Sequence, residues 1–206
     1  MTSNVWLDSI RHVDALIPDI NGVLRGKRLA IDELARLEEN GLQLPGTIFT
    51  TDITGATVSF EDLGWLVGDP DMLCRVEPGT LCPAPRDEAV ARVMMSMYTL
   101  DGEPFFADPG HVLASVLRRF EKAGLTAVMA MELEFYLTEY DGARLAPRPP
   151  KSPLSGEREW GVQVYGMTEI WDFRDILGDI ERFCRIRGCR RRRPVPSTRP
   201  ASSRST

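Results

Sequence analysis

The chain has 206 residues, of which 43% are hydrophobic, and it carries four cysteines and two histidines. This length suits one large domain or two small ones, and the lack of an 18-residue apolar run argues against a membrane span. The first ten residues do not follow the basic-then-apolar order of a secretion signal, so we expect a cytoplasmic protein. No two cysteines form a CxxC pair, which argues against a zinc site.

The net charge of −5 hides an uneven distribution of charge along the chain. Residues 1–181 hold all 30 acidic residues and 16 basic ones, a balance of −14, whereas residues 182–206 hold nine arginines and no acid. The run RRRR at residues 190–193 could contact phosphates, but it has no aromatic neighbours and follows an acidic chain, so no nucleic-acid partner is expected. Residues 188–206 have no apolar periodicity and are predicted to be a disordered tail.

The first hundred residues predict a small sheet with one helix. Residues 12–30 form two strands around Asn21-Gly22, a dipeptide typical of tight hairpins. Asp32 is expected to cap a short helix, which Gly41 ends. Further strands are expected at residues 47–53, 57–60 and 89–100, with a loop over residues 68–85. This order of elements predicts an α+β unit of about 100 residues.

A clear helix follows these strands. Asp108 is a suitable N-cap, Pro109 suits the first helical position, and Gly124 suits the end of the helix. The helix has an apolar stripe that we expect to be buried, formed by Val112, Leu113, Val116, Leu117 and Phe120. Residues 160–166 could form a strand, and another helix is predicted from Glu169 to Ile186, in which Gly178 is expected to cost about 1 kcal/mol relative to alanine.

The segment AVMAMELEFYL, residues 127–137, predicts a buried strand with two carboxylates on one face. The Cα atoms of Glu132 and Glu134 would lie about 6.6 Å apart, which is two strand rises of about 3.3 Å. Two like charges on an enclosed wall repel each other and lose hydration, and a hard cation such as Mg²⁺ would relieve both costs. The alternatives are an exposed strand face with solvated acids, or acids that are merely paired.

Several short motifs occur in the order known from one enzyme family: DINGVLRGKR, FTTDITGATV, GDPDM, DGEPF followed by DPGHVL, and MELEFYL. With these motifs the chain resembles the glutamine synthetase family, most closely its gamma-glutamylpolyamine (glutamylputrescine-type) branch. The resemblance implies an N-terminal β-grasp domain over residues 10–104. It also implies the incomplete start of a catalytic α/β domain over residues 108–187, truncated at its C-terminal end.

The resemblance further implies an ATP-dependent ligase that joins the γ-carboxylate of glutamate to ammonia or a primary amine through γ-glutamyl phosphate. Mg²⁺ or Mn²⁺ would assist, with Glu134 matching the ligand of the ion near glutamate and Glu132 that of the ion near the ATP phosphates. Asp52 falls in a segment that, by resemblance, approaches the active site of a neighbouring subunit, so a homo-oligomer is implied. A turn-capping role for Asp52 is equally compatible with the sequence.

Some residues and alternatives stay open at this stage. Arg25, Lys27 and Arg28 are interpreted as exposed hairpin charges rather than a phosphate patch. Gly110-His111 stands where family members often carry an arginine. Because the other ligands of the family lie beyond residue 187, the chain by itself is expected to be inactive. The alternative function is a non-catalytic β-grasp fragment that associates with full-length relatives, and residues 188–206 are hypothesised to be out of frame.

Overall fold

A computed structural model describes residues 5–58, 68–131, 137–140, 145–146, 149–158 and 166–186. The chain divides into two compact units, Met1–Val128 and Met129–Thr206. Within the described residues, no helix has the length and apolar content needed to cross a lipid bilayer.

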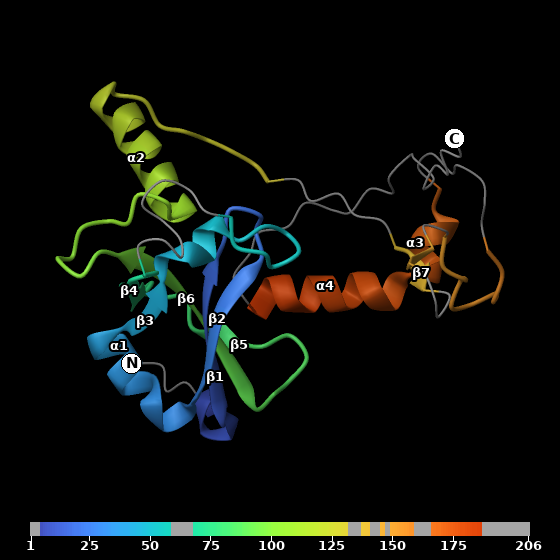
Figure 1. Cartoon of the computed structure of the whole chain (residues 1–206). Coiled ribbons are helices and arrows are strands. Elements are labelled where there is room, and N and C mark those ends of the chain that lie inside the picture. The colour runs from blue at the N-terminus through green and yellow to red at the C-terminus, as the bar shows by residue number, and fades with distance from the viewer. Residues whose placement is uncertain are drawn as a thin grey trace. The chain divides into compact units, whose positions relative to one another are not determined.

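The first unit is built on one mixed sheet of six strands (Figure 1). The strand order is β2-β1-β6-β4-β3, and β5 pairs with β6. β1 and β6 run parallel, whereas the other pairs are antiparallel. The strands are β1 (His12–Pro18), β2 (Leu24–Ala30), β3 (Leu42–Pro45), β4 (Asp71–Val76), β5 (Cys82–Pro83) and β6 (Val90–Tyr98). The mixture of helices with a largely antiparallel sheet agrees with the predicted α+β composition.

The hairpin of β1 and β2 is confirmed where the sequence predicts it. Gly22 in the turn has a φ of +77°, a conformation that glycine adopts without strain. Gly26 in β2 has a φ of +151°, and a Cβ atom added there would lie 1.8 Å from the carbonyl oxygen of Ala15. The two strands therefore approach so closely that a side chain at residue 26 has no room.

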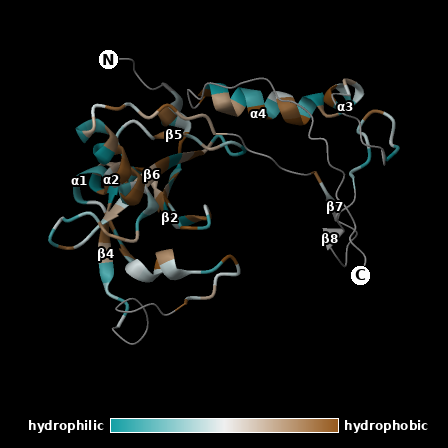
Figure 2. Ribbon diagram, turned by 90° about the horizontal axis from the view of Figure 1, so that it is seen from above, coloured by the Kyte–Doolittle hydropathy of each residue, from teal (hydrophilic) through white to brown (hydrophobic). Residues whose placement is uncertain are grey.

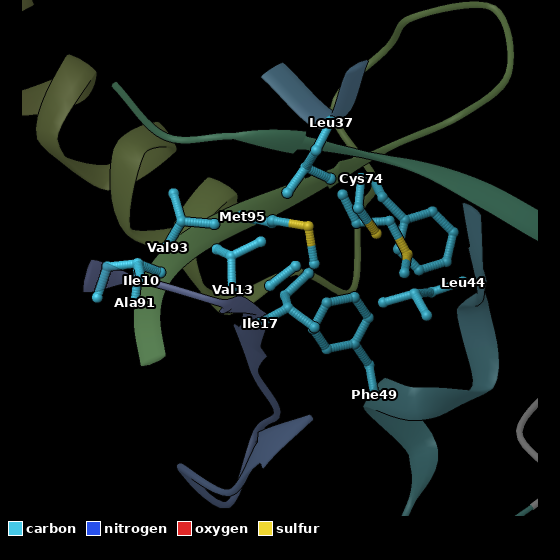
Figure 3. Packing of buried hydrophobic residues seen from close by; sticks show 13 residues of the cluster. Ile10, Val13, Ile17, Leu37, Leu44, Phe49, Cys74, Ala91, Val93 and Met95 are labelled. Atoms are coloured by element: carbon cyan, nitrogen blue, oxygen red, sulfur yellow. The ribbon is translucent and has the colours of Figure 1, made fainter. Parts of the chain in front are cut away.

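The hydrophobic core lies against one face of this sheet (Figure 3). β1 and β6 alternate between buried and half-buried residues, as expected for strands with one face in a core. Leu37 from α1 (Leu34–Asn40) and Phe49 from the 3₁₀ helix η3 (Gly46–Thr50) complete the packing. The largest of the fully buried side chains are Ile17, Met97, Val13, Val90, Val93 and Cys74.

Two local expectations for the N-terminal half are wrong. A 3₁₀ turn, η2 (Ile31–Glu33), precedes α1, and the Glu33 carboxylate accepts the Ala30 N–H at 3.2 Å, so Asp32 is not the helix cap. Residues 46–50 form η3 instead of the expected strand. The hydroxyl of Thr50 donates to the Thr47 carbonyl at 3.0 Å, and this local bond competes with strand pairing. A short 3₁₀ helix, η1 (Val5–Ser9), begins the described chain.

The loop predicted over residues 68–85 contains β4, which pairs with both β3 and β6. Sequence reasoning missed this strand because glycine, aspartate and proline surround it. Gly41 does end α1, with a φ of +74°. Of the strand expected at residues 57–60, only Thr57 and Val58 are described, and Thr57 forms an isolated bridge with Thr51.

Helix α2 (Pro109–Lys122) begins where predicted, but its apolar stripe is not buried. Val112, Leu113, Val116 and Phe120 are between 40% and 53% exposed. The core is filled by the strands, α1 and η3, and no described element of this unit covers the apolar face of α2. The expectation of a buried stripe is therefore wrong for the described residues.

The second unit has little regular structure in its described residues. Two short strands, β7 (Glu139–Tyr140) and β8 (Leu145–Ala146), pair with each other. The predicted C-terminal helix is present as α3 (Thr168–Asp172) and α4 (Arg174–Ile186), with a break at Phe173. Hydrophilic and hydrophobic residues both appear along α4 (Figure 2). Gly178 does not interrupt α4, and the strand proposed for residues 160–166 lies outside the described residues except for Gly166.

Candidate functional site

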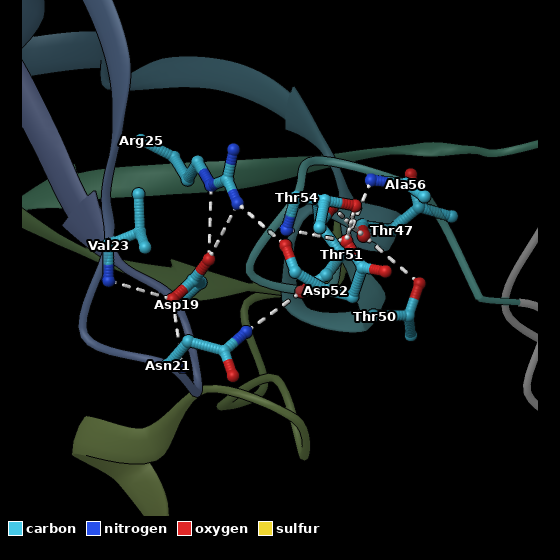
Figure 4. Close-up of polar contacts among 10 residues, drawn as sticks. All are labelled: Asp19, Asn21, Val23, Arg25, Thr47, Thr50, Thr51, Asp52, Thr54 and Ala56. Carbon is cyan, nitrogen blue, oxygen red and sulfur yellow. Dashed lines mark hydrogen bonds and ion pairs between the residues drawn. The ribbon is translucent and has the colours of Figure 1, made fainter. Parts of the chain in front are cut away.

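The segment around Asp52, which is predicted to approach the substrate, forms a short loop whose turn is capped by the Asp52 side chain (Figure 4). A bridge between Thr51 and Thr57 closes the loop, which we call the Asp52 loop (residues 51–57). One carboxylate oxygen of Asp52, Oδ1, accepts the N–H of Thr54 at 2.8 Å, its hydroxyl at 2.7 Å, and the N–H of Ala56 at 2.9 Å. Asp52 therefore caps its own turn, as one of the two sequence interpretations allowed.

These bonds favour the ionised form of Asp52. The Thr54 hydroxyl and the backbone N–H groups of Ala56 and Thr54 hold the pKa of this carboxyl below its ordinary value, against a smaller opposing effect of burial. The approach of Asp52 to a substrate remains a prediction.

A second carboxylate, Asp19, lies at the start of the hairpin turn and is almost fully buried. Asp19 is 3% exposed. Its Oδ1 accepts the backbone N–H groups of Asn21 at 2.8 Å and Val23 at 2.9 Å, and its Oδ2 accepts the Arg25 guanidinium at 3.0 Å. Burial by itself raises the pKa of Asp19, but the bonds from Val23, Arg25 and Asn21 outweigh it, so the pKa is lowered. The buried carboxylate is therefore charged and satisfied.

The hairpin turn contacts the Asp52 loop through two of these residues (Figure 4). Arg25 pairs with Asp19 and also donates through Nη2 to the carbonyl oxygen of Asp52 at 3.4 Å. Asn21 donates through Nδ2 to the carbonyl oxygen of Thr51 at 3.0 Å. Sequence reasoning missed this contact because residues 25 and 52 are 27 positions apart. The one local feature of the sequence that could have indicated this contact is Asp19, an acidic residue directly before the turn.

The other basic residues of the hairpin also have partners. Arg28 donates to Asp14 at 2.6 and 3.1 Å, and Lys27 donates to the carbonyl oxygen of Gln43 at 3.4 Å. The guanidinium of Arg28, next to Asp14, has a raised pKa because of that hydrogen bond and the negative charge. These pairings favour the interpretation of Arg25, Lys27 and Arg28 as hairpin charges over that of a phosphate patch, although Arg25 is only partly exposed.

The start of α2 is fixed to the end of β6. Asp108, 2% exposed, accepts the N–H of Met97 at 2.7 Å and that of Gly110 at 2.8 Å. His111 donates through Nε2 to the carbonyl oxygen of Met97 at 2.8 Å, and its ring meets that of Tyr98 edge-on at 4.7 Å. His111 therefore anchors the start of α2 to the end of β6.

The two predicted metal ligands, Glu132 and Glu134, lie outside the described residues. The described start of their segment, residues 127–131, is not a strand, and Val128 and Met131 are 90% and 86% exposed. A strand needs a neighbour to accept its backbone hydrogen bonds, and none of the described strands pairs with residues 127–131. The prediction of a buried strand is therefore wrong for residues 127–131. No group of three or more His, Cys, Asp or Glu residues suited to a metal occurs in the described part of the chain.

Comparison with solved structures shows what kind of fold this is. The chain is similar to the structure titled "GmaS/ADP complex-Conformation 1", with a TM-score of 0.59 and 20% sequence identity. The similarity covers 85% of this chain and 36% of that chain. In sequence, residues 106–202 match the family "Glutamine synthetase, catalytic domain". The chain belongs to the glutamine synthetase family.

Two characterised relatives are similar over most of the chain. The gamma-glutamylputrescine synthetase PuuA of Escherichia coli (strain K12) is 35% identical over 178 residues, which is 85% of this chain. The glutamate–isopropylamine ligase of a Pseudomonas species is 28% identical over 172 residues, or 82% of this chain. The chain spans 38% and 37% of the lengths of these two relatives.

Proposed function

We propose that the chain is part of a cytoplasmic, ATP-dependent ligase that joins the γ-carboxylate of glutamate to a primary amine or ammonia through γ-glutamyl phosphate. The observation that carries this proposal is the 35% identity over 178 residues to a gamma-glutamylputrescine synthetase. A second relative is named for joining glutamate to isopropylamine, which favours an amine over ammonia as the acceptor.

The fold assigned to this function has two parts. A β-grasp domain spans residues 10–104, and the beginning of the catalytic domain spans residues 108–187. The mixed sheet with its own core supports the first assignment, and the family match from residue 106 supports the second. Residues 188–206 are rich in arginine, and an altered reading frame is proposed for them, although the family match extends to residue 202.

Glu132 and Glu134 are proposed to hold Mg²⁺ or Mn²⁺ beside ATP. Carboxylate oxygens suit both ions, and such a cation neutralises charge on the phosphoryl group in transfer. Water and phosphate oxygens can supply some of the six ligands of Mg²⁺, but two carboxylates cannot fill the coordination of two such ions and also orient ATP. The 206-residue chain is therefore proposed to be inactive by itself, and Asp52 to face the substrate of a neighbouring subunit in a homo-oligomer.

Metal binding tests this function directly. Titration of the chain with Mn²⁺ in the presence of a non-hydrolysable ATP analogue is expected to show weak Mn²⁺ binding through these two carboxylates, which Glu132→Gln and Glu134→Gln each weaken about tenfold or more. Tight, nucleotide-dependent binding by the chain alone would contradict its proposed inactivity. Glu103→Gln removes an exposed acid elsewhere and should leave the affinity unchanged. Equal Mn²⁺ affinity of the wild type and both glutamine variants would refute the assignment.

The alternative is a non-catalytic fragment that associates with a full-length relative. The independent core of the first unit favours it, because this unit buries its own apolar residues. Sedimentation of the chain together with purified E. coli PuuA distinguishes the two functions. A stable mixed assembly without Mn²⁺ binding supports the fragment, and Mn²⁺ binding without a mixed assembly supports the ligase part.

A further inference from the structure

The β1–β2 hairpin and the Asp52 loop are not neighbours in the sheet. β2 lies at one end of the strand order, and β3, which leads into η3 and the Asp52 loop, lies at the other. Side chains of the hairpin nevertheless reach this end of the sheet at three backbone carbonyls, that of Gln43 in β3 and those of Thr51 and Asp52 in the Asp52 loop. The donors are Lys27, Asn21 and Arg25, all from the hairpin. Polar contacts therefore connect two segments that strand pairing leaves apart.

Arg25 is the donor among these with a fixed position. Its guanidinium is held by the carboxylate of Asp19, whose side chain has no exposed surface, while that of Arg25 is 27% exposed. Asp19 is itself held by two backbone N–H groups of the turn. A planar guanidinium can donate in two directions from one position, to Asp19 and to the Asp52 carbonyl, which a lysine cannot reproduce in the same geometry.

The Asp52 loop supports itself by local bonds and has little apolar anchoring. Asp52 N–H donates to the Ala56 carbonyl at 2.8 Å, and Val58 N–H donates to the Thr50 carbonyl at 2.9 Å. Ile53 at its tip is 71% exposed and Val58 is 55% exposed. Since these side chains do not enter the core, the placement of the loop depends on polar contacts at its base.

We propose that Asp19 and Arg25 are positioning residues: the buried Asp19 carboxylate fixes Arg25, and Arg25 with Asn21 holds the Asp52 loop against the hairpin. The pair presents the Asp52 carboxylate and the loop tip in one preset arrangement. The consequence for ligase activity rests on the function proposed above. The positioning itself does not, and hydrogen exchange measures it without substrate.

The test compares amide hydrogen exchange in the full chain for Arg25→Gln and Arg28→Gln. Both variants remove one positive charge from β2, but Arg28 pairs with Asp14 and does not contact the loop. In Arg25→Gln we expect the amides of Asp52, Ala56 and Val58 to exchange at least tenfold faster. Exchange in the core strand β6 should change much less, and Arg28→Gln should leave the loop unchanged.

Two outcomes would overturn the proposal. One is loop exchange in Arg25→Gln within twofold of the wild type. The other is an equal acceleration of the loop and β6, which would show a loss of global stability alone. Arg25→Lys keeps the charge beside Asp19, so it should restore β6 protection and leave the loop fast. Should Arg25→Gln fail to fold, Asn21→Ala removes a loop contact without exposing Asp19, and unchanged loop exchange in that variant refutes the proposal.

Discussion

The close approach of β1 and β2 at Gly26 makes Gly26→Ala the most informative stability variant. The added methyl group would meet the Ala15 carbonyl oxygen at 1.8 Å, whereas ordinary contact begins at 3.4 Å. The oxygen is a backbone atom and the methyl carbon would be bonded directly to the backbone, in an antiparallel pair in which Gly26 lies opposite Leu16. The strands must therefore separate locally, because no flexible side chain can move aside.

The expected cost has two parts. A φ of +151° is essentially restricted to glycine, and forcing alanine there costs about 1–3 kcal/mol. Separating the strands weakens about two ladder hydrogen bonds, each worth about 0.5–1.5 kcal/mol. Gly26→Ala should thus lower the free energy of unfolding by about 2–6 kcal/mol. That is a large share of the roughly 5–15 kcal/mol typical of a folded domain.

Gly22→Ala is the matched control for the steric part of this cost. Gly22 lies in the same hairpin at a φ of +77°, but nothing lies within 4 Å of an added Cβ atom. It should cost only the backbone strain of about 1–2 kcal/mol. Urea denaturation followed by circular dichroism measures both variants. Equal destabilisation of the two would refute the clash, while insoluble Gly26→Ala beside folded Gly22→Ala would agree with it.

Two further predictions concern carboxylates. Asp108→Ala leaves the buried N–H of Met97 without its acceptor and removes the cap of α2, so the free energy of unfolding should fall by about 2–4 kcal/mol. Urea denaturation measures this loss, with Asp101→Ala, a change at an exposed aspartate, as the control. A loss below about 1 kcal/mol, similar to that of the control, would contradict the role of Asp108. The pKa values of Asp19 and Asp52 lie below the ordinary 3.8, so the stabilisation from their ionised forms is complete above that pH and is lost as pH falls through the lower folded pKa values. Acid denaturation of Asp19→Asn should accordingly depend less on pH below 3.8 than that of the wild type, and identical pH profiles would count against the assignment.

Elements with strong local signals were predicted well. The Asn21-Gly22 turn between alternating strands, the aspartate and proline at the start of α2, and Gly41 after α1 each act through the conformation of one or two residues. Neighbouring residues suffice for such signals. The mixed helix and sheet content and the family followed from the same stretches of sequence.

The misses share a different cause. Thr47 to Thr50 have the β-branched composition of a strand, yet their hydroxyl and carbonyl groups satisfy each other in a 3₁₀ turn. β4 looked like a loop because its pairing with β3 and β6 depends on segments distant in sequence. The stripe of α2 was expected to be buried, but amphipathicity shows which face is apolar and says nothing of what covers it.

The same distinction between local and long-range information applies to the candidate site. Motif order in the sequence predicts the family, which the comparisons confirm, whereas the ligase chemistry and the roles of Glu132, Glu134 and Asp52 stay predictions. Tertiary structure alone revealed that Asp19 is buried, that it fixes Arg25, and that Arg25 reaches the carbonyl of Asp52. The reason is physical: a residue type and its near neighbours determine local conformation and chemical capability. Which distant backbone group a side chain reaches depends on how the sheet brings separate segments together.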